Sequence, residues 1–291
     1  MFNMKSTFKP VCLYLMLFPC LLLIRCVNQQ QGKIKNPTGY DLTRPIKYEL
    51  PDELTEISGI AFNKGNADTI YAEQDEKGTL FSFKPGSKDI QRTKFGKSGD
   101  YEDVAIINNQ VIMLRSDGAL FIFPLNAGAN TEANTKTWEG LLPQGEYEGI
   151  YADESSQSVY VLCKHCGMEK SSKTSTVFTL NLTADSLLKN AGQNAIDVTK
   201  IAELSRQKKI TFHPSGLSRS PLTGDWYILS SVNKLLIVTD TNWVVKEVYP
   251  LNPQLFGQPE GIAFDKDNNL YISNEGDKLR MGNVLKFAFK K

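Results

Sequence analysis

The sequence has almost no net charge and very little histidine. It contains 33 basic and 32 acidic side chains, which leaves a formal net charge of +1. A nucleic-acid-binding protein needs a basic face or stripe, so we expect no nucleic-acid partner. The chain has only two histidines and no Gly-x-Ser-x-Gly motif, which excludes the nucleophile elbow of the α/β-hydrolases.

The N-terminus carries an uncharged apolar run, Val11–Ile24, which follows Lys5 and Lys9. Fourteen residues are too few to cross a hydrocarbon layer of about 30 Å, but they match the apolar region of an export signal. A buried core helix is the alternative. We therefore predict that residues 1–25 are a signal peptide.

The apolar run ends in Leu23–Cys26 (LIRC), which resembles a lipoprotein box. In such a box the cysteine becomes the lipidated first residue of the mature chain. Arg25 stands where a small residue is usual, and Cys20 fits the pattern less well. We predict lipidation at Cys26, with residues 26–37 as a polar tether to the membrane. An uncleaved N-terminal anchor is the alternative.

Five segments of the remaining chain repeat one pattern, in which polar residues precede a marker residue and a short apolar strand follows it. The markers lie 44, 46, 67 and 45 residues apart, and spacings in the forties are typical of a four-stranded propeller blade. We predict an all-β fold, a single β-propeller of five four-stranded blades over residues 38–291. The markers are Gly59, Asp103, Gly149, Gly216 and Gly261.

The fifth repeat ends after its third strand, so an N-terminal strand within Pro45–Leu50 is predicted to complete the last blade. Closing the ring in this way removes an unpaired strand edge. In the third repeat, Asp197–Leu204 is predicted to be the outer strand, and Ala184–Gln193 has a helical pattern. If Lys170–Lys209 forms a sheet of its own, the alternative is six blades. A β-sandwich would not explain the near-constant spacing.

Two of the repeats carry longer motifs. Tyr147–Tyr151 (YEGIY) is followed by Val159–Lys164 (VYVLCK), and Pro259–Ala263 (PEGIA) by Asn268–Glu275 (NNLYISNE). Their ordered succession over Leu50–Phe287 resembles the SdiA-regulated family of bacterial β-propeller proteins. This resemblance implies an exported propeller but no particular reaction. Together with the predicted anchor, it places the protein in the cell envelope of a Gram-negative bacterium, facing the periplasm or the cell surface.

Polar residues just before each marker are predicted to meet at the central channel, because inner strands line that channel. Oxygen ligands from several blades suit calcium, which takes six to eight of them. Pairing with nearby cations or simple solvation of the acidic ring are the alternatives. The predicted metal ligands are Glu102, Glu148, Glu260, Asn274 and Glu275. The other predicted channel residues are Glu56, Ser58, Asp75, Arg115, Asp117, Lys164 and Ser215.

His213 is a weak candidate for a catalytic base, since an unperturbed histidine titrates near pH 6.5. Ser215 lies two residues away and can share its strand face, but no third residue orients such a pair. Cys163 and Cys166 are predicted to form a disulfide, as close cysteines do in an oxidising compartment. Free thiols and a metal site are the alternatives.

These features favour a binding or scaffold module for an unknown small ligand or an envelope protein. The alternative is a calcium-dependent hydrolase of small esters, lactones or phosphoesters, in which the metal would polarise a carbonyl or activate water. A purely structural envelope protein is the third hypothesis.

Overall fold

The computed structural model describes residues 1, 35–127, 131–167, 170–183 and 187–291. Apart from Met1, the predicted signal peptide lies outside these residues, and so does Cys26. In the described part of the chain, no helix is long and apolar enough to cross a membrane. Lys35–Lys291 forms one compact unit.

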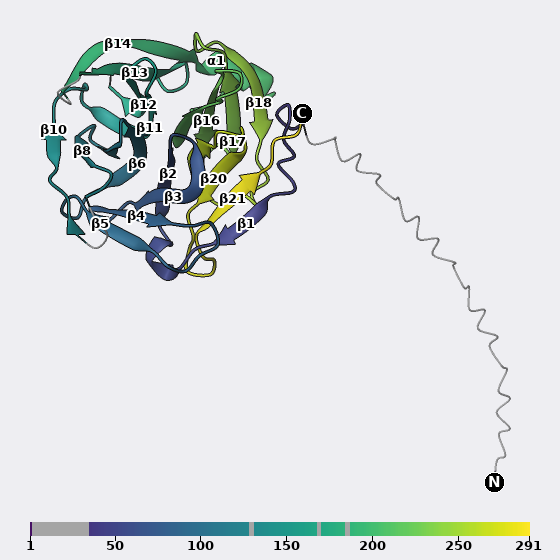
Figure 1. Cartoon of the computed structure of the whole chain (residues 1–291). Coiled ribbons are helices and arrows are strands. Elements are labelled where there is room, and N and C mark those ends of the chain that lie inside the picture. Colours follow the sequence, from purple (N-terminus) through teal and green to yellow (C-terminus); the bar gives the residue numbers. More distant parts are fainter. Residues whose placement is uncertain (2–34, 128–130, 168–169, 184–186) are drawn as a thin grey trace. The chain divides into compact units, whose positions relative to one another are not determined.

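Five β-sheets surround a common axis and form a five-bladed β-propeller, as predicted (Figure 1). Blade 1 contains β2 (Ile57–Asn63), β3 (Asn66–Gln74), β4 (Thr79–Phe83) and β5 (Gln91–Lys94), with the short β9 (Thr131–Glu132) added in parallel. Blade 2 contains β6 (Tyr101–Ile107), β7 (Gln110–Arg115), β8 (Leu120–Pro124) and β10 (Lys136–Trp138). Blade 3 contains β11 (Gly145–Asp153), β12 (Ser158–Cys166), β13 (Thr174–Leu182) and β14 (Leu188–Asp197).

Blade 4 contains β15 (Gly216–Arg219), β16 (Trp226–Ser230), β17 (Leu235–Thr239) and β18 (Val245–Pro250). Blade 5 contains β19 (Pro259–Phe264), β20 (Leu270–Asn274) and β21 (Asn283–Phe287), and its outer strand is β1 (Ile46–Glu49). Two short helices, η1 (Asp52–Leu54) and α1 (Val198–Leu204), lie in the connections.

The N-terminal strand closes the ring as predicted. β1 pairs antiparallel with β21, and Ile46 lies opposite Lys286 (Figure 1). The segment before β1 is held by Tyr40, a buried residue whose hydroxyl donates to the carbonyl oxygen of Asn268 at 2.7 Å. The first and last parts of the propeller domain are therefore fastened together both by a strand pair and by a buried aromatic side chain.

The hydrophobic core is divided into five clusters, one at each interface between neighbouring blades. The cluster between blades 5 and 1, for example, joins Ala263 and Tyr271 of blade 5 to Ile60 and Phe81 of blade 1. Successive residues of a strand point to opposite sides, so each blade contributes to two clusters. Ile60 and Ala61 accordingly belong to different clusters.

The structure corrects the prediction for the outer part of blade 3. Val198–Leu204 is the helix α1, because the Asp197 side chain accepts hydrogen bonds from the backbone N–H groups of Thr199 and Lys200 and caps its N-terminus. The outer strand is instead β14, which overlaps the segment predicted to be helical. It was missed because eight of its ten residues are exposed, so that it lacks the apolar alternation of an inner strand. The insertion lengthens blade 3 and adds no sixth blade.

Candidate functional site

Irregular strand pairing turns the residues before the markers toward the channel. In β6 the register shifts between Tyr101 and Asp103, and in β11 between Tyr147 and Gly149, so Glu102 and Glu148 are left out of the ladder. Similar shifts occur in β2 around Ser58 and in β19 around Glu260. Such bulges re-aim a side chain next to a site. The repeat therefore encodes a ring of inward-facing polar groups.

The backbone N–H groups at these irregularities are satisfied by buried carboxyl groups. Glu73 accepts from the N–H of Gly59 at 2.6 Å. Asp103 accepts from the N–H of Val104 and from that of Ile150 in the next blade, both at 2.8 Å. Asp103 thus links two inner strands, and this explains why an acidic residue occupies the marker position of blade 2.

Most markers are glycine because the inner strands approach one another closely. A Cβ atom on Gly216 would lie 2.4 Å from the carbonyl oxygen of Glu260, and one on Gly261 would lie 2.4 Å from that of Ser58. Residues before the markers line a central cavity of about 440 Å³. Residues after them line a second cavity of about 360 Å³. The close contacts between the inner strands at the glycine markers therefore lie between the central cavity and the second cavity.

The central cavity collects nine of the residues predicted from the sequence. They come from all five blades, and the ring is acidic because six carboxyl groups line it. The nine are Ser58, Asp75, Glu102, Glu148, Lys164, His213, Ser215, Glu260 and Glu275. Further residues of the lining include Asp100, Ser231, Lys234 and Gln258.

The other four predicted residues do not line this cavity. Arg115 and Asp117 pair with each other in two contacts of 2.9 and 2.8 Å. Asn274 is buried and donates to Asn283 at 3.1 Å. Glu56 acts from a distance, as a charge that raises the pKa of Asp75 and Glu275.

The five predicted metal ligands are therefore not brought together as one set. Among the described residues, no three His, Cys, Asp or Glu side chains are grouped closely enough to hold a metal ion. The carboxyl groups project from separate blades, so they are spread around a cavity much larger than a single ion. Calcium binding at these residues stays a prediction.

A hydrogen-bonded row of charges lies across blades 2 and 3. Lys164 forms an ion pair with Glu148. Burial raises the pKa of Glu102 to about 9, and repulsion from Glu148 adds to this effect. Burial also raises the pKa of Glu148, whereas its contacts with Lys164 and Glu102 act to lower it. The hydrogen bond between the two carboxyl groups raises the pKa of Glu102, so Glu102 holds the proton and donates it to Glu148.

Three further carboxyl groups of the lining also have raised pKa values. Burial raises the pKa of Glu260 to about 8, that of Glu275 to about 7 and that of Asp75 to about 6. In each case repulsion from neighbouring carboxyl groups adds to the effect of burial. Clustered perturbed pKa values of this kind are typical of functional sites.

Unpaired oxygens lie next to the cavity on the side of blades 5 and 1. One carboxyl oxygen each of Glu73 and Asp75, and the side-chain oxygen of Asn274, are buried without a hydrogen-bond partner. Burial raises the pKa of Glu73 well above its usual value. Unsatisfied buried acceptors are costly. This side of the cavity therefore favours protons or other cations.

The structure assigns Ser215 a structural role. Its hydroxyl donates to the carbonyl oxygen of Pro259 at 2.8 Å and accepts from the N–H of Ser231 at 3.2 Å. His213 lines the cavity, and burial together with the charge of Lys164 lowers its pKa. A neutral imidazole at this position can accept a proton, but the neighbouring serine hydroxyl is already engaged with the backbone.

Sequence reasoning missed Glu73, Ser231 and Lys234. Glu73 follows the apolar run of β3 and is completely buried. Acidic residues are rarely buried without a partner, so an acidic residue next to an apolar run of a strand indicates a buried polar contact. Ser231 and Lys234 lie in the turn after β16 and had no counterpart in the repeat.

A protein-family model described as SdiA-regulated matches residues 39–279, nearly the whole propeller domain. The chain belongs to the SdiA-regulated family. This confirms the resemblance carried by the repeated motifs. A comparison with curated proteins found no match.

Several solved propellers are similar in fold. The glutaminyl cyclase of Myxococcus xanthus is 14% identical, with a TM-score of 0.57 over 85% of this chain and 97% of that one. The PQQ-bound aldose sugar dehydrogenase of Streptomyces coelicolor is 10% identical, with a TM-score of 0.53 over 89% and 100%. A luciferin-regenerating enzyme is 13% identical, with a TM-score of 0.51 over 84% and 95%. At these identities the likeness shows the fold alone.

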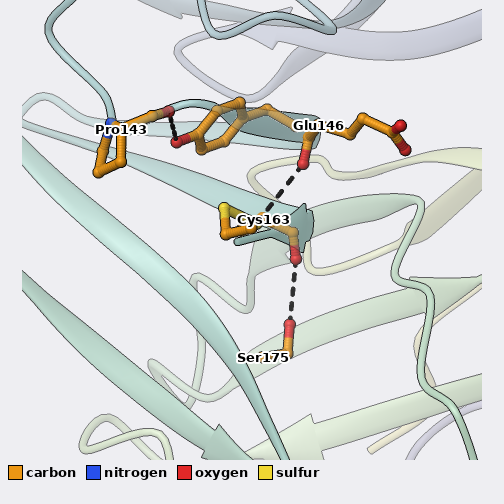
Figure 2. Close-up of a disulfide and its surroundings, with 6 residues drawn as sticks. Pro143, Glu146, Cys163 and Ser175 are labelled. Carbon is orange, nitrogen blue, oxygen red and sulfur yellow. Dashed lines mark hydrogen bonds between the residues drawn. A yellow bond between two sulfur atoms is a disulfide. The ribbon is translucent and has the colours of Figure 1, made fainter. Parts of the chain in front are cut away.

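Cys163 and Cys166 form a disulfide at the end of β12 (Figure 2). The Sγ atom of Cys163 lies 3.5 Å from the carbonyl oxygen of Glu146, and Ser175 donates to the carbonyl oxygen of Cys163 at 3.2 Å. Glu146 pairs with His165 and the next residue pairs with Cys163, so Lys164 is left out of the ladder. The disulfide therefore brackets the lysine that enters the cavity.

Replacing both cysteines by alanine is expected to lower the free energy of unfolding by about 2 kcal/mol, the loop-entropy value for so short a loop. For a domain of this size the melting temperature should fall by roughly 4–8 °C. Thermal melting with and without a reductant provides the check. Reduction should destabilise the wild type and leave the double variant unchanged. Equal melting temperatures of the wild type and the double variant, both measured without reductant, would contradict a stabilising disulfide.

Proposed function

We propose that this SdiA-regulated propeller is an exported, membrane-anchored binding module whose central cavity takes a cationic ligand. The observation that carries the proposal is the charge of the cavity. Six carboxyl groups line it, against the ammonium groups of Lys164 and Lys234. The carboxyl groups are those of Asp75, Asp100, Glu102, Glu148, Glu260 and Glu275.

The two lysines cannot balance all six carboxyl groups once these ionise. Lys164 is engaged by Glu148, and Lys234 donates to the backbone oxygen of Gly257 at 2.7 Å. The repulsion that raises the pKa values of Glu260 and Glu275 is relieved by a proton or by any other bound cation. A cationic ligand therefore competes with protons for the same carboxyl groups.

Binding can be measured by calorimetric titration of the soluble domain with calcium and, separately, with methylammonium. We expect affinity for each cation to rise about tenfold between pH 6 and pH 8, because the competing protons leave over this range. Glu260→Gln should weaken binding about tenfold. Asp117→Asn makes the same chemical change outside the cavity and should leave binding intact. A wild-type domain that binds neither cation at pH 8 would refute the proposal.

Hydrolysis is the second candidate function, and one observation favours it. Burial raises the pKa of Glu102 to about 9, whereas Lys164 opposes the effect of burial on Glu148, and carboxyl groups whose environments push their pKa values apart are suited to act as general acid and general base. Turnover of small esters, lactones or phosphoesters that Glu148→Gln removes would support this function. Dependence of that turnover on calcium would test the metal-assisted form of the same hypothesis.

A further inference from the structure

A side pocket of about 350 Å³ adjoins the central cavity, and the two share Glu275 as a lining residue. The side chain of Gln258, which lines the central cavity, donates to Glu275, so Glu275 marks the boundary between the side pocket and the central cavity. The lining of the side pocket also includes Leu255, Leu279 and Met281. An acidic cavity and a pocket with several apolar residues therefore lie next to each other.

The apolar residues at this place are unusually exposed. Seven large hydrophobic residues are exposed in the described part of the chain, and three of them lie here. Leu279 is 94% exposed and Met281 45%, and Val232, which lines the central cavity, is 68% exposed. Single exposed hydrophobic residues need no explanation, but a group beside a cavity marks a binding surface.

The charged residues of the side pocket are already paired. Arg280 contacts Asp277 at 2.9 Å, and Lys47 contacts Glu49 at 3.2 Å. The side pocket thus offers no uncompensated basic group to an acidic ligand. Its apolar surface lies next to the carboxyl group of Glu275.

We propose that the ligand is an amphiphilic amine, with its ammonium group in the central cavity and its apolar chain in the side pocket against Leu279 and Met281. This inference rests on the proposed function, because the central cavity must first bind a cation. The ion pair of Lys164 with Glu148 shows how the cavity holds an ammonium group at the end of an alkyl chain. Glu275 lines both spaces and therefore lies where the charged end meets the apolar chain.

The test is calorimetric titration of the folded domain at pH 8 with methylammonium, butylammonium and hexylammonium. Hexylammonium should bind at least tenfold more tightly than methylammonium, since burying roughly two methylene groups suffices for this gain. Leu279→Ser combined with Met281→Ser should abolish the dependence on chain length and leave methylammonium binding unchanged. Leu222→Ser changes a residue that is 61% exposed and lies outside both sites, so it serves as the control.

The outcomes separate the two proposals. Tight binding of all three amines with no dependence on chain length would overturn the amphiphilic ligand and leave the cationic ligand standing. Failure of every amine to bind would overturn both. A peptide N-terminus with apolar side chains shares this chemistry, so leucyl-leucinamide is measured in parallel. If it binds more tightly than hexylammonium, the ligand is a peptide; if it binds less tightly, the ligand is an alkylamine.

Discussion

Gly261→Ala is expected to lower the melting temperature of the propeller by roughly 6–12 °C, which corresponds to a loss of about 3 kcal/mol in the free energy of unfolding. The added Cβ would lie 2.4 Å from the carbonyl oxygen of Ser58 and 2.5 Å from the hydroxyl oxygen of Ser273. Ser273 donates to that same carbonyl oxygen and accepts from the N–H of Gly261. The substitution therefore disturbs the junction of blades 5 and 1.

Gly167→Ala is the matched control for this substitution. A Cβ at Gly167 meets no atom within 4 Å, and the backbone there is not in the left-handed region. Its melting temperature should stay within about 2 °C of the wild type. Equal melting temperatures for the two variants, measured by circular dichroism, would show that the inner strands can separate at little cost.

The second large effect is a loss of stability as pH rises from about 4.5 to 9. Folding raises the pKa of Glu275 to about 7, that of Glu260 to about 8 and that of Glu102 to about 9, from an ordinary value of 4.5. In this range the folded state binds more protons than the unfolded chain. The stabilisation from these protons is complete below about pH 4.5 and is lost as pH rises through the folded values.

Melting temperatures measured at pH 5 and pH 8.5 test this expectation. Glu260→Gln cannot ionise, so its melting temperature at pH 8.5 should exceed that of the wild type by roughly 3–6 °C, whereas the two proteins should be similar at pH 5. The melting temperature of Asp117→Asn should depend on pH as that of the wild type does, because Asp117 lies outside the cavity and Arg115 lowers its pKa. A wild-type protein more stable at pH 8.5 than at pH 5 would contradict the assigned protonation states.

The fold was largely predictable because each blade repeats a local pattern. The marker spacing gave the number of blades, and the missing outer strand of the fifth repeat indicated the role of β1, which now pairs with β21. Blade 3 was harder. A strand on the outer edge has few apolar contacts, so the sequence of β14 is mostly polar and lacks the pattern of a strand. The N-cap at Asp197 begins a helix in a segment whose sequence resembles a strand.

The site was predictable where the repeat encodes it and not elsewhere. Glu102, Glu148 and Glu260 occupy equivalent positions, so the sequence placed them in one ring. Asn274 and Arg115 were expected at the channel but lie outside its lining, because Asn274 donates to Asn283 and Arg115 pairs with Asp117. Protonation states depend on burial and on neighbours from other blades, which only the folded chain brings together.

The most direct test of the central claim is the number of protons released when the domain binds methylammonium. It is obtained by calorimetric titration at pH 7.5 in two buffers that differ in ionisation enthalpy. Because the cation replaces protons on Glu260 and Glu275, we predict release of roughly half a proton or more per bound cation, and less from Glu260→Gln. Binding that releases no proton, or no binding at all, would contradict a cavity whose carboxyl groups exchange protons for a cationic ligand.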